Sequence, residues 1–196
     1  IRPSMRGMTS RDVILMYLPL FHCFGLYEGP IMSMVTGARM VLMASFDAKL
    51  TLELIEKESA TVLNGFDTHF FDITAHSDCN TTDKSSLRVA LLAAGMASSQ
   101  PVAERTQVNL CPTITAWGMT EVGVGATRSF LDSSGDDRCL ASGHPLPGYE
   151  FKIIEPDTGQ TQKFGTMGEL CVRGYSVISV ILRRGSRLSF ELRGAW

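Results

Sequence analysis

Apolar residues in this chain fall into short continuous runs, separated by mixed stretches with roughly helical spacing. Such runs are typical of strands that are buried on both faces of a parallel sheet. They occupy residues 12–20, 39–43, 61–63, 87–94 and 113–116. The stretches predicted to be helical occupy residues 26–35, 48–59, 67–76 and 101–108. This alternation predicts an α/β fold, with a doubly wound and mostly parallel sheet layer and its helices.

The pattern changes after Gly125. Residues 131–137 predict a polar loop, and residues 143–148 predict a rigid double turn rich in glycine and proline. Residues 149–154 and 166–173 predict strands of a small antiparallel or barrel-like β subdomain. We therefore expect three parts, namely an α/β subdomain over residues 1–130, a β-rich piece over residues 131–177 and an atypical tail over residues 178–196.

Composition narrows the class of protein. The hydrophobic share of 44% and the charged share of 19% are typical of a globular chain with a real core, and the net charge of −2 gives no basic field for nucleic acid. No apolar run is long enough to span a bilayer. The 5 cysteines are scattered without a CxxC pair, which favours reduced thiols and a cytoplasmic location. The chain starts at Ile1, so we expect that the natural protein begins further upstream, and its oligomeric state is left open.

The richest candidate chemistry follows the last of the predicted parallel strands. Trp117 offers a flat ring for a planar ligand, and Gly118 permits close approach of the backbone. Thr120 offers a hydroxyl group, and Glu121 offers a carboxylate for a hard cation such as Mg²⁺. These residue types suit the binding of a nucleotide together with its metal ion. Taken alone, the segment is better explained as an ordinary loop, with Trp117 as a core anchor and Glu121 as a solvated loop carboxylate.

A second candidate is His22, which follows the first predicted strand. Ligands of α/β sheets bind at the carboxyl ends of the strands, so this turn is a plausible place for a site. The alternative is a structural histidine packed beside Phe21 and Phe24.

Three segments occur in an order that carries a family resemblance. They are Leu-Pro-Leu-Phe-His at residues 18–22, Trp-Gly-Met-Thr-Glu at residues 117–121 and Gly-Glu-Leu-Cys-Val-Arg-Gly at residues 168–174. The chain resembles the AMP-forming acyl-CoA synthetases, a family of adenylate-forming ligases. The resemblance implies a central fragment of the N-terminal domain of an ATP-dependent ligase. Its full-length parent would turn a carboxylic acid, fatty or otherwise apolar, into an acyl-adenylate and then an acyl-CoA, with ATP, Mg²⁺ and coenzyme A.

The resemblance also implies roles for single residues. Trp117, in place of the family's usual Tyr, would stack on adenine, with Gly118 and Met119 completing that segment. Thr120 would bind the α-phosphate and Glu121 would hold Mg²⁺. Gly95 and Met96 would border adenine and the acyl carboxylate, and His22 would lie beside that carboxylate.

The chain departs from the family pattern in three places. The phosphate-gripping loop upstream, the downstream Thr-Gly-Asp and the C-terminal lid with its catalytic Lys are not found in the sequence. We therefore expect the chain alone to be inactive as a ligase. The alternative to a ligase part is a non-catalytic, truncated nucleotide-binding or interaction module of the same fold. For the tail over residues 178–196, a shifted reading frame is one hypothesis, and a diverged or vector-derived end is the other.

Overall fold

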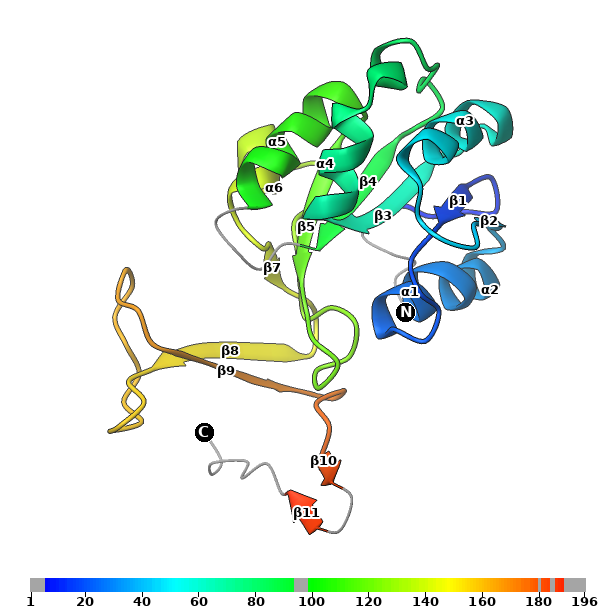
Figure 1. Ribbon diagram of the computed structural model, residues 1–196. Coiled ribbons are helices and arrows are strands. Elements are labelled where there is room, and N and C mark those ends of the chain that lie inside the picture. The colour runs from blue at the N-terminus through cyan, green and yellow to red at the C-terminus, as the bar shows by residue number, and fades with distance from the viewer. Residues whose placement is uncertain (1–5, 94–98, 180, 184–185, 189–196) are drawn as a thin grey trace.

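The computed structural model describes residues 6–93, 99–179, 181–183 and 186–188. Its centre is a seven-stranded sheet in the order β2-β1-β3-β4-β5-β6-β7 (Figure 1). The strands are β1 (Val13–Met16), β2 (Arg39–Leu42), β3 (Val62–Phe66), β4 (Val89–Ala93), β5 (Thr113–Trp117), β6 (Thr127–Arg128) and β7 (His144–Pro145). The first five pair in parallel, whereas β6 and β7 add on in antiparallel fashion. The predicted doubly wound, mostly parallel sheet is therefore confirmed.

Helices cover the sheet on both sides. Figure 1 shows α3, α4 and α5 grouped together, with α1 and α2 on the other side of β1. Their bounds are α1 (Cys23–Leu26), α2 (Met32–Thr36), α3 (Ala48–Glu58), α4 (Asp67–Ala75), α5 (Gln100–Asn109) and α6 (Gly135–Leu140), with a 3₁₀ turn at Ser77–Asn80. None of the helices in these described ranges is long and apolar enough to cross a membrane.

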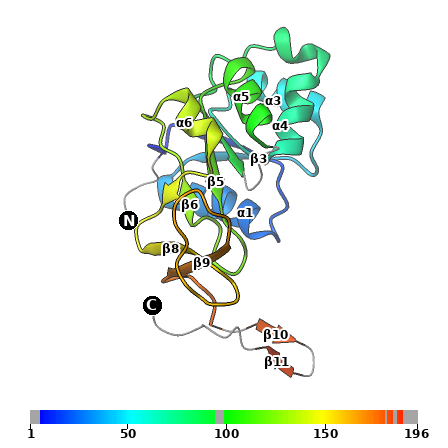
Figure 2. The same cartoon turned by 90° about the vertical axis from the view of Figure 1, so that its left-hand side faces the viewer.

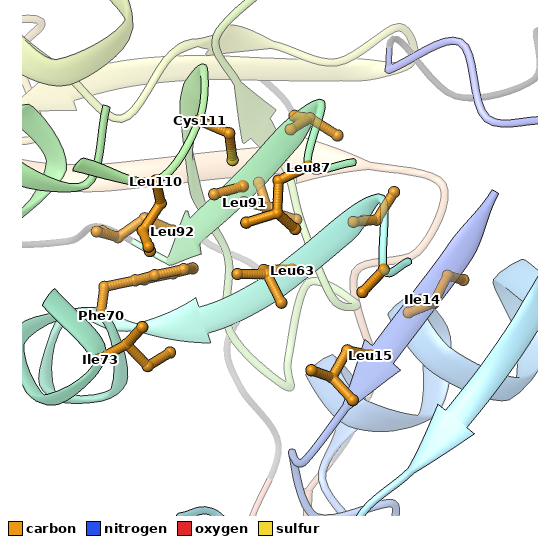
Figure 3. Packing of buried hydrophobic residues seen from close by; sticks show 14 of the residues in the cluster. Ile14, Leu15, Leu63, Phe70, Ile73, Leu87, Leu91, Leu92, Leu110 and Cys111 are labelled. Atoms are coloured by element: carbon orange, nitrogen blue, oxygen red, sulfur yellow. The ribbon is translucent and has the colours of Figure 1, made fainter. Parts of the chain in front are cut away.

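The main core lies between the parallel strands and the layer of α3, α4 and α5. Figure 3 shows Phe70 and Ile73 of α4 facing Leu63 of β3 and Leu92 of β4, and all four side chains are fully buried. The α3 helix begins at Asp47, whose carboxylate accepts a hydrogen bond from the Leu50 backbone N–H at 2.7 Å. This N-cap satisfies a backbone donor at the start of the helix.

The helix predicted over residues 26–35 differs from the observed one in its start and its shape. It begins three residues earlier, at Cys23, and its middle is a π-helical turn over Tyr27–Ile31. Pro30 lies inside that turn. Because proline has no backbone N–H and its ring crowds the preceding turn, a regular α-helix is disfavoured there and the wider turn accommodates it.

Two further predictions were wrong in part. The polar loop expected over residues 131–137 ends inside α6, which begins after Ser134, whose hydroxyl accepts a hydrogen bond from the Asp137 backbone N–H at 3.1 Å. The double turn expected over residues 143–148 contains β7, which pairs with β6. Both elements contact the main sheet or its helices: α6 lies against α5 and β5, and β7 pairs with β6. The division into domains at residue 130 stays a prediction.

The β-rich part that follows is antiparallel, as predicted. Strands β8 (Tyr149–Ile154) and β9 (Glu169–Gly174) form a two-stranded ribbon, and β10 (Ile181–Arg183) pairs with β11 (Ser186–Leu188) in another. Figures 1 and 2 show both ribbons extending away from the main sheet. A second small cluster of Val122, Ala126 and Tyr149, with Trp117 and Phe151 against it, joins the first ribbon to the loop after β5.

Candidate active site

A cavity of about 280 Å³ lies where the carboxyl ends of β1, β3, β4 and β5 meet. Its walls come from the segment after β1, from the ends of β3, β4 and β5, and from the loop between β5 and β6. The strand order 2-1-3-4-5 reverses direction between β1 and β3, which is the place where ligands bind in open α/β sheets. The lining residues are His22, Cys23, Phe24, Glu28, Phe66, Leu91, Ala93, Ala116, Trp117, Gly118, Met119, Thr120, Glu121, Val124, Gly125 and Arg128.

The predicted residues that the structure describes all line this one cavity. They are His22, Trp117, Gly118, Met119, Thr120 and Glu121. His22 and Thr120 are separated by almost a hundred residues, and the fold brings their segments together, with the Cys23 Sγ 3.9 Å from the Thr120 Oγ1. Gly95 and Met96, the other two predicted residues, lie outside the described residues.

His22 combines a structural contact with an exposed position at the cavity. Its Nδ1 accepts a hydrogen bond from the Phe24 backbone N–H at 3.2 Å, which caps the start of α1. The imidazole stands edge-on to the Phe66 ring, with the centroids 6.0 Å apart. Because Nδ1 is used as an acceptor, the neutral ring carries its proton on Nε2, which can donate to a ligand.

Trp117 is half-buried at the end of β5. Its backbone N–H donates to the Thr127 Oγ1 at 3.2 Å, and its ring meets Phe151 edge-on at 6.0 Å between centroids. The indole therefore packs against the small cluster that holds β8 and also lines the cavity. The core and ligand-facing interpretations of this residue are compatible with each other.

Gly118 is required by its own loop. A Cβ atom at this position would lie 2.4 Å from the Val124 carbonyl oxygen and 2.8 Å from the Gly125 Cα. Such contacts are far inside normal packing distances, so the close backbone approach predicted at Gly118 is between two sides of the β5–β6 loop. The loop therefore folds back on itself and presents Met119, Thr120 and Glu121 at the cavity.

The loop is further fixed by backbone hydrogen bonds. The Val122 N–H donates to the Met119 carbonyl at 3.1 Å, and the Gly123 N–H donates to that of Thr120 at 3.3 Å. The Glu121 carbonyl accepts from the Ile178 N–H at 2.9 Å. These bonds use main-chain groups, so the half-buried Glu121 carboxylate is left to face a ligand, and the exposed Thr120 hydroxyl has only the Cys23 thiol as a hydrogen-bonding partner among the described side chains.

The chemistry of Glu121 fits a magnesium ion that is held chiefly by a substrate. Among the described residues, no group of three or more His, Cys, Asp or Glu side chains could hold a metal. Mg²⁺ usually binds through one or two protein carboxylates together with phosphate oxygens and water. A single carboxylate beside an exposed threonine in one cavity is compatible with that mode of binding.

A buried charge cluster at the cavity was missed by sequence reasoning. The Glu28 carboxylate accepts from the Arg128 Nη2 at 2.7 Å and also from the Arg6 guanidinium, whose Nη1 donates to the Asn64 Oδ1 at 2.7 Å. All three charged side chains are less than a tenth exposed. Burial alone would raise the pKa of Glu28, but the two guanidinium groups lower it below its ordinary value, and burial lowers the pKa of Arg6 to about 10.

The sequence is similar to known acyl-activating proteins over most of its length. The sequence model of the family described as AMP-binding enzyme matches residues 1–182. The acyl-CoA ligase SID4 of Ajellomyces capsulatus is 36% identical over 172 residues, covering 86% of this chain and 29% of the relative. The mitochondrial medium-chain acyl-CoA ligase ACSF2 of Rattus norvegicus is 30% identical over 180 residues, covering 90% of this chain and 29% of the relative. The chain thus spans about a third of the length of these relatives, whose names give no support to a non-catalytic module.

Solved structures show the same fold. O-succinylbenzoate coenzyme A synthetase of Bacillus subtilis, solved in complex with AMP, has a TM-score of 0.73 and 27% identity, covering 87% of this chain and 34% of that chain. The anthranilate CoA ligase AuaEII, solved with anthranoyl-AMP, has a TM-score of 0.78 at 23% identity, covering 88% of this chain and 33% of that one. At that lower identity the likeness concerns the fold alone.

Proposed function

Because the chain belongs to the family of AMP-binding enzymes, we propose that it forms part of an ATP-dependent ligase that joins a carboxylic acid to coenzyme A. The observation that carries the proposal is the single cavity that gathers His22 from the end of β1 and Trp117 to Glu121 from the end of β5. An adenylating site requires residues from distant segments to be held together around one ligand cavity.

The reaction proceeds in two displacements. In the first, a carboxylate oxygen attacks the α-phosphorus of ATP, and the bond to pyrophosphate breaks. In the second, the thiol sulfur of coenzyme A attacks the acyl carbon, AMP leaves with the electron pair of the broken bond, and the thiol proton is released to water. Both steps depend mainly on positioning and on stabilising negative charge, which is the contribution expected of the lining residues.

Each of the six predicted residues that line the cavity has a definite role in this proposal. Trp117 stacks on adenine, and Gly118 and Met119 shape the same side of the cavity. Thr120 donates its hydroxyl hydrogen to an α-phosphate oxygen. Glu121 would hold a magnesium ion, which neutralises phosphate charge when bound. The Nε2–H group of His22 donates a hydrogen bond to the substrate carboxylate and holds that carboxylate near the α-phosphate.

The proposal extends to the location of the protein in the cell and to its binding partners. The cytoplasmic location predicted from the cysteines stays a prediction, since the rat relative carries a mitochondrial name. The absence of a basic field still predicts no binding of nucleic acid. The acid, ATP and coenzyme A are the proposed partners, and Gly95 and Met96 stay predicted contacts of adenine and the acid.

The proposal is tested with the complete protein that carries this sequence. We expect acid-dependent exchange of pyrophosphate into ATP, and thioester formation once coenzyme A is added. Replacing Trp117 with Ala should raise the KM for ATP about five- to 150-fold, since stacking on a base contributes roughly 1–3 kcal/mol, and Trp117→Phe should raise it less. Phe164→Ala removes a fully exposed ring between β8 and β9 and serves as the control. A lack of exchange with every acid tried would reject the ligase, and an unchanged KM in Trp117→Ala would reject the adenine contact.

A further inference from the structure

The floor of the cavity carries a charge cluster that the roles above do not use. The rim residues His22, Met119 and Thr120 are exposed, whereas the side chains of Glu28 and Arg128 are 3% and 9% exposed. Both line the same cavity. A ligand that enters past His22 therefore meets Glu28 and Arg128 at its inner end.

The cluster has an excess of positive charge. Two guanidinium groups, from Arg6 and Arg128, share the single carboxylate of Glu28. That carboxylate already accepts from both arginines, one on each oxygen. One positive charge is thus left without a matching negative charge within this cluster.

Arg128 also has hydrogen-bonding capacity to spare. A guanidinium group has five N–H donors, and the structure assigns Arg128 a side-chain bond from Nη2 to Glu28. Among the described residues, its buried Nε has no hydrogen-bond partner. An unpartnered buried donor is costly, so a group that accepts from it would be favoured.

From this arrangement we infer that the acid substrate carries a second anionic group at its far end, and that Arg128 at the cavity floor binds this group. The segment between the two ends of the acid would contact Phe24, Phe66 and Leu91, which are apolar and line the same cavity. The inferred substrate class is therefore an acid with a short apolar middle and a terminal carboxylate or equivalent anion. This inference rests on the proposed ligase function.

The alternative is that Glu28 and Arg128 form a purely structural ion pair below a pocket for an apolar acid. An apolar chain end would then press on a charged and incompletely paired guanidinium group. Excluding water from that group without giving it an acceptor has a free-energy cost.

The two substrate classes are separated by comparing acids of equal chain length. Adipate is measured against hexanoate, and suberate against octanoate, by acid-dependent pyrophosphate exchange in the complete protein. We expect the wild type to prefer each dicarboxylate by about tenfold or more in kcat/KM. This is the range that a charge-assisted hydrogen bond supplies.

Variants then assign the preference to Arg128. Arg128→Met should remove the preference chiefly by raising KM for the dicarboxylates, and Arg128→Lys should keep part of it. Glu28 stays paired with Arg6 in both variants, so both are expected to fold, which their unfolding midpoints check. Arg39→Met is the matched control, because it deletes an arginine of an exposed ion pair with Glu58 on β2 and α3.

The outcomes distinguish the two proposals. Exchange with hexanoate and octanoate at least equal to that with the dicarboxylates in the wild type would overturn the role of Arg128 while supporting the ligase. A dicarboxylate preference that persists in a folded Arg128→Met protein would overturn it as well. Exchange with none of these acids, nor with any wider panel, would reject the ligase itself.

Discussion

At the scale of single residues, the best-defined buried charges of this chain lie against groups that pair with them. Asp12, at the start of β1, accepts from the Arg88 Nε at 2.6 Å and Nη2 at 2.8 Å, from the Thr61 hydroxyl at 2.8 Å and from the Thr9 N–H at 2.8 Å. Arg88 immediately precedes β4, so its bond to Asp12 links the starts of β1 and β4. A buried carboxylate with this many donors stabilises the fold in its ionised form.

The pH dependence of stability follows from Asp12. Burial alone would raise its pKa, but the hydrogen bonds from Arg88, Thr9 and Thr61 lower it to about 2, from an ordinary 3.8. The resulting stabilisation is present above pH 3.8 and is lost as the pH falls through about 2. We expect Asp12→Asn to lower the free energy of unfolding by about 2 kcal/mol at neutral pH and to flatten this acid-dependent loss.

Urea unfolding of the chain at neutral pH and across the acid range checks this expectation. Asp157→Asn is the matched control, because Asp157 is exposed between β8 and β9, and it should change the free energy of unfolding by no more than about 0.5 kcal/mol. Equal stability of the wild type and Asp12→Asn would show that the bonds to Arg88 contribute nothing net.

Single residues also mark the limit of sequence reasoning about the site. His22 and the segment from Trp117 to Glu121 could be predicted, because each follows an apolar strand and belongs to a contiguous motif. Glu28 and Arg128 could not, since they are 100 residues apart and only the fold joins them. Neither residue carries a local signal beyond a charge amid apolar neighbours.

At the scale of elements, strands and helices with a strong local pattern were predictable. The five parallel strands and the helices α3, α4 and α5 lie where the alternation of apolar and mixed stretches indicates. The two-residue strands β6 and β7 have no pattern of their own and exist through pairing with the edge of the sheet. The short α6 did carry a signal, namely Ser134 as N-cap followed by two acidic residues, but the polar composition favoured a loop.

The β5–β6 loop offers a prediction of its own at this scale. Gly118→Ala would place a methyl group 2.4 Å from the Val124 carbonyl oxygen, so the loop must shift. We expect a loss of about 1–3 kcal/mol in stability and a weaker affinity for ATP, because Thr120 and Glu121 move with the loop. Gly125→Ala, in the same loop, would meet no protein atom within 4 Å and is the control for stability. Unfolding curves that are equal for the two variants would contradict this account.

At the scale of the whole molecule, the site is open on one side. The ends of β3, β4 and β5 and the loop after β5 line the cavity, whereas the rim residues Met119 and Thr120 are exposed. Phe164 and Met167, in the β8–β9 ribbon, are also almost fully exposed. Adenylation needs a site that excludes water and holds the phosphates from several sides.

The chain of 196 residues should therefore fold without catalysing adenylation. Its buried core of parallel strands and helices predicts a cooperative unfolding transition when it is expressed alone. Its exchange of pyrophosphate into ATP should equal that of a control without protein. Positioning of the reactants and stabilisation of charge each contribute orders of magnitude to the rate of adenylation, and a site that is open on one side supplies them incompletely. The complete protein, assayed at the same molar concentration and with the same acids, should show exchange. Exchange by the folded chain alone that disappears in Thr120→Ala would prove this expectation wrong, and would place the whole adenylating machinery within these residues.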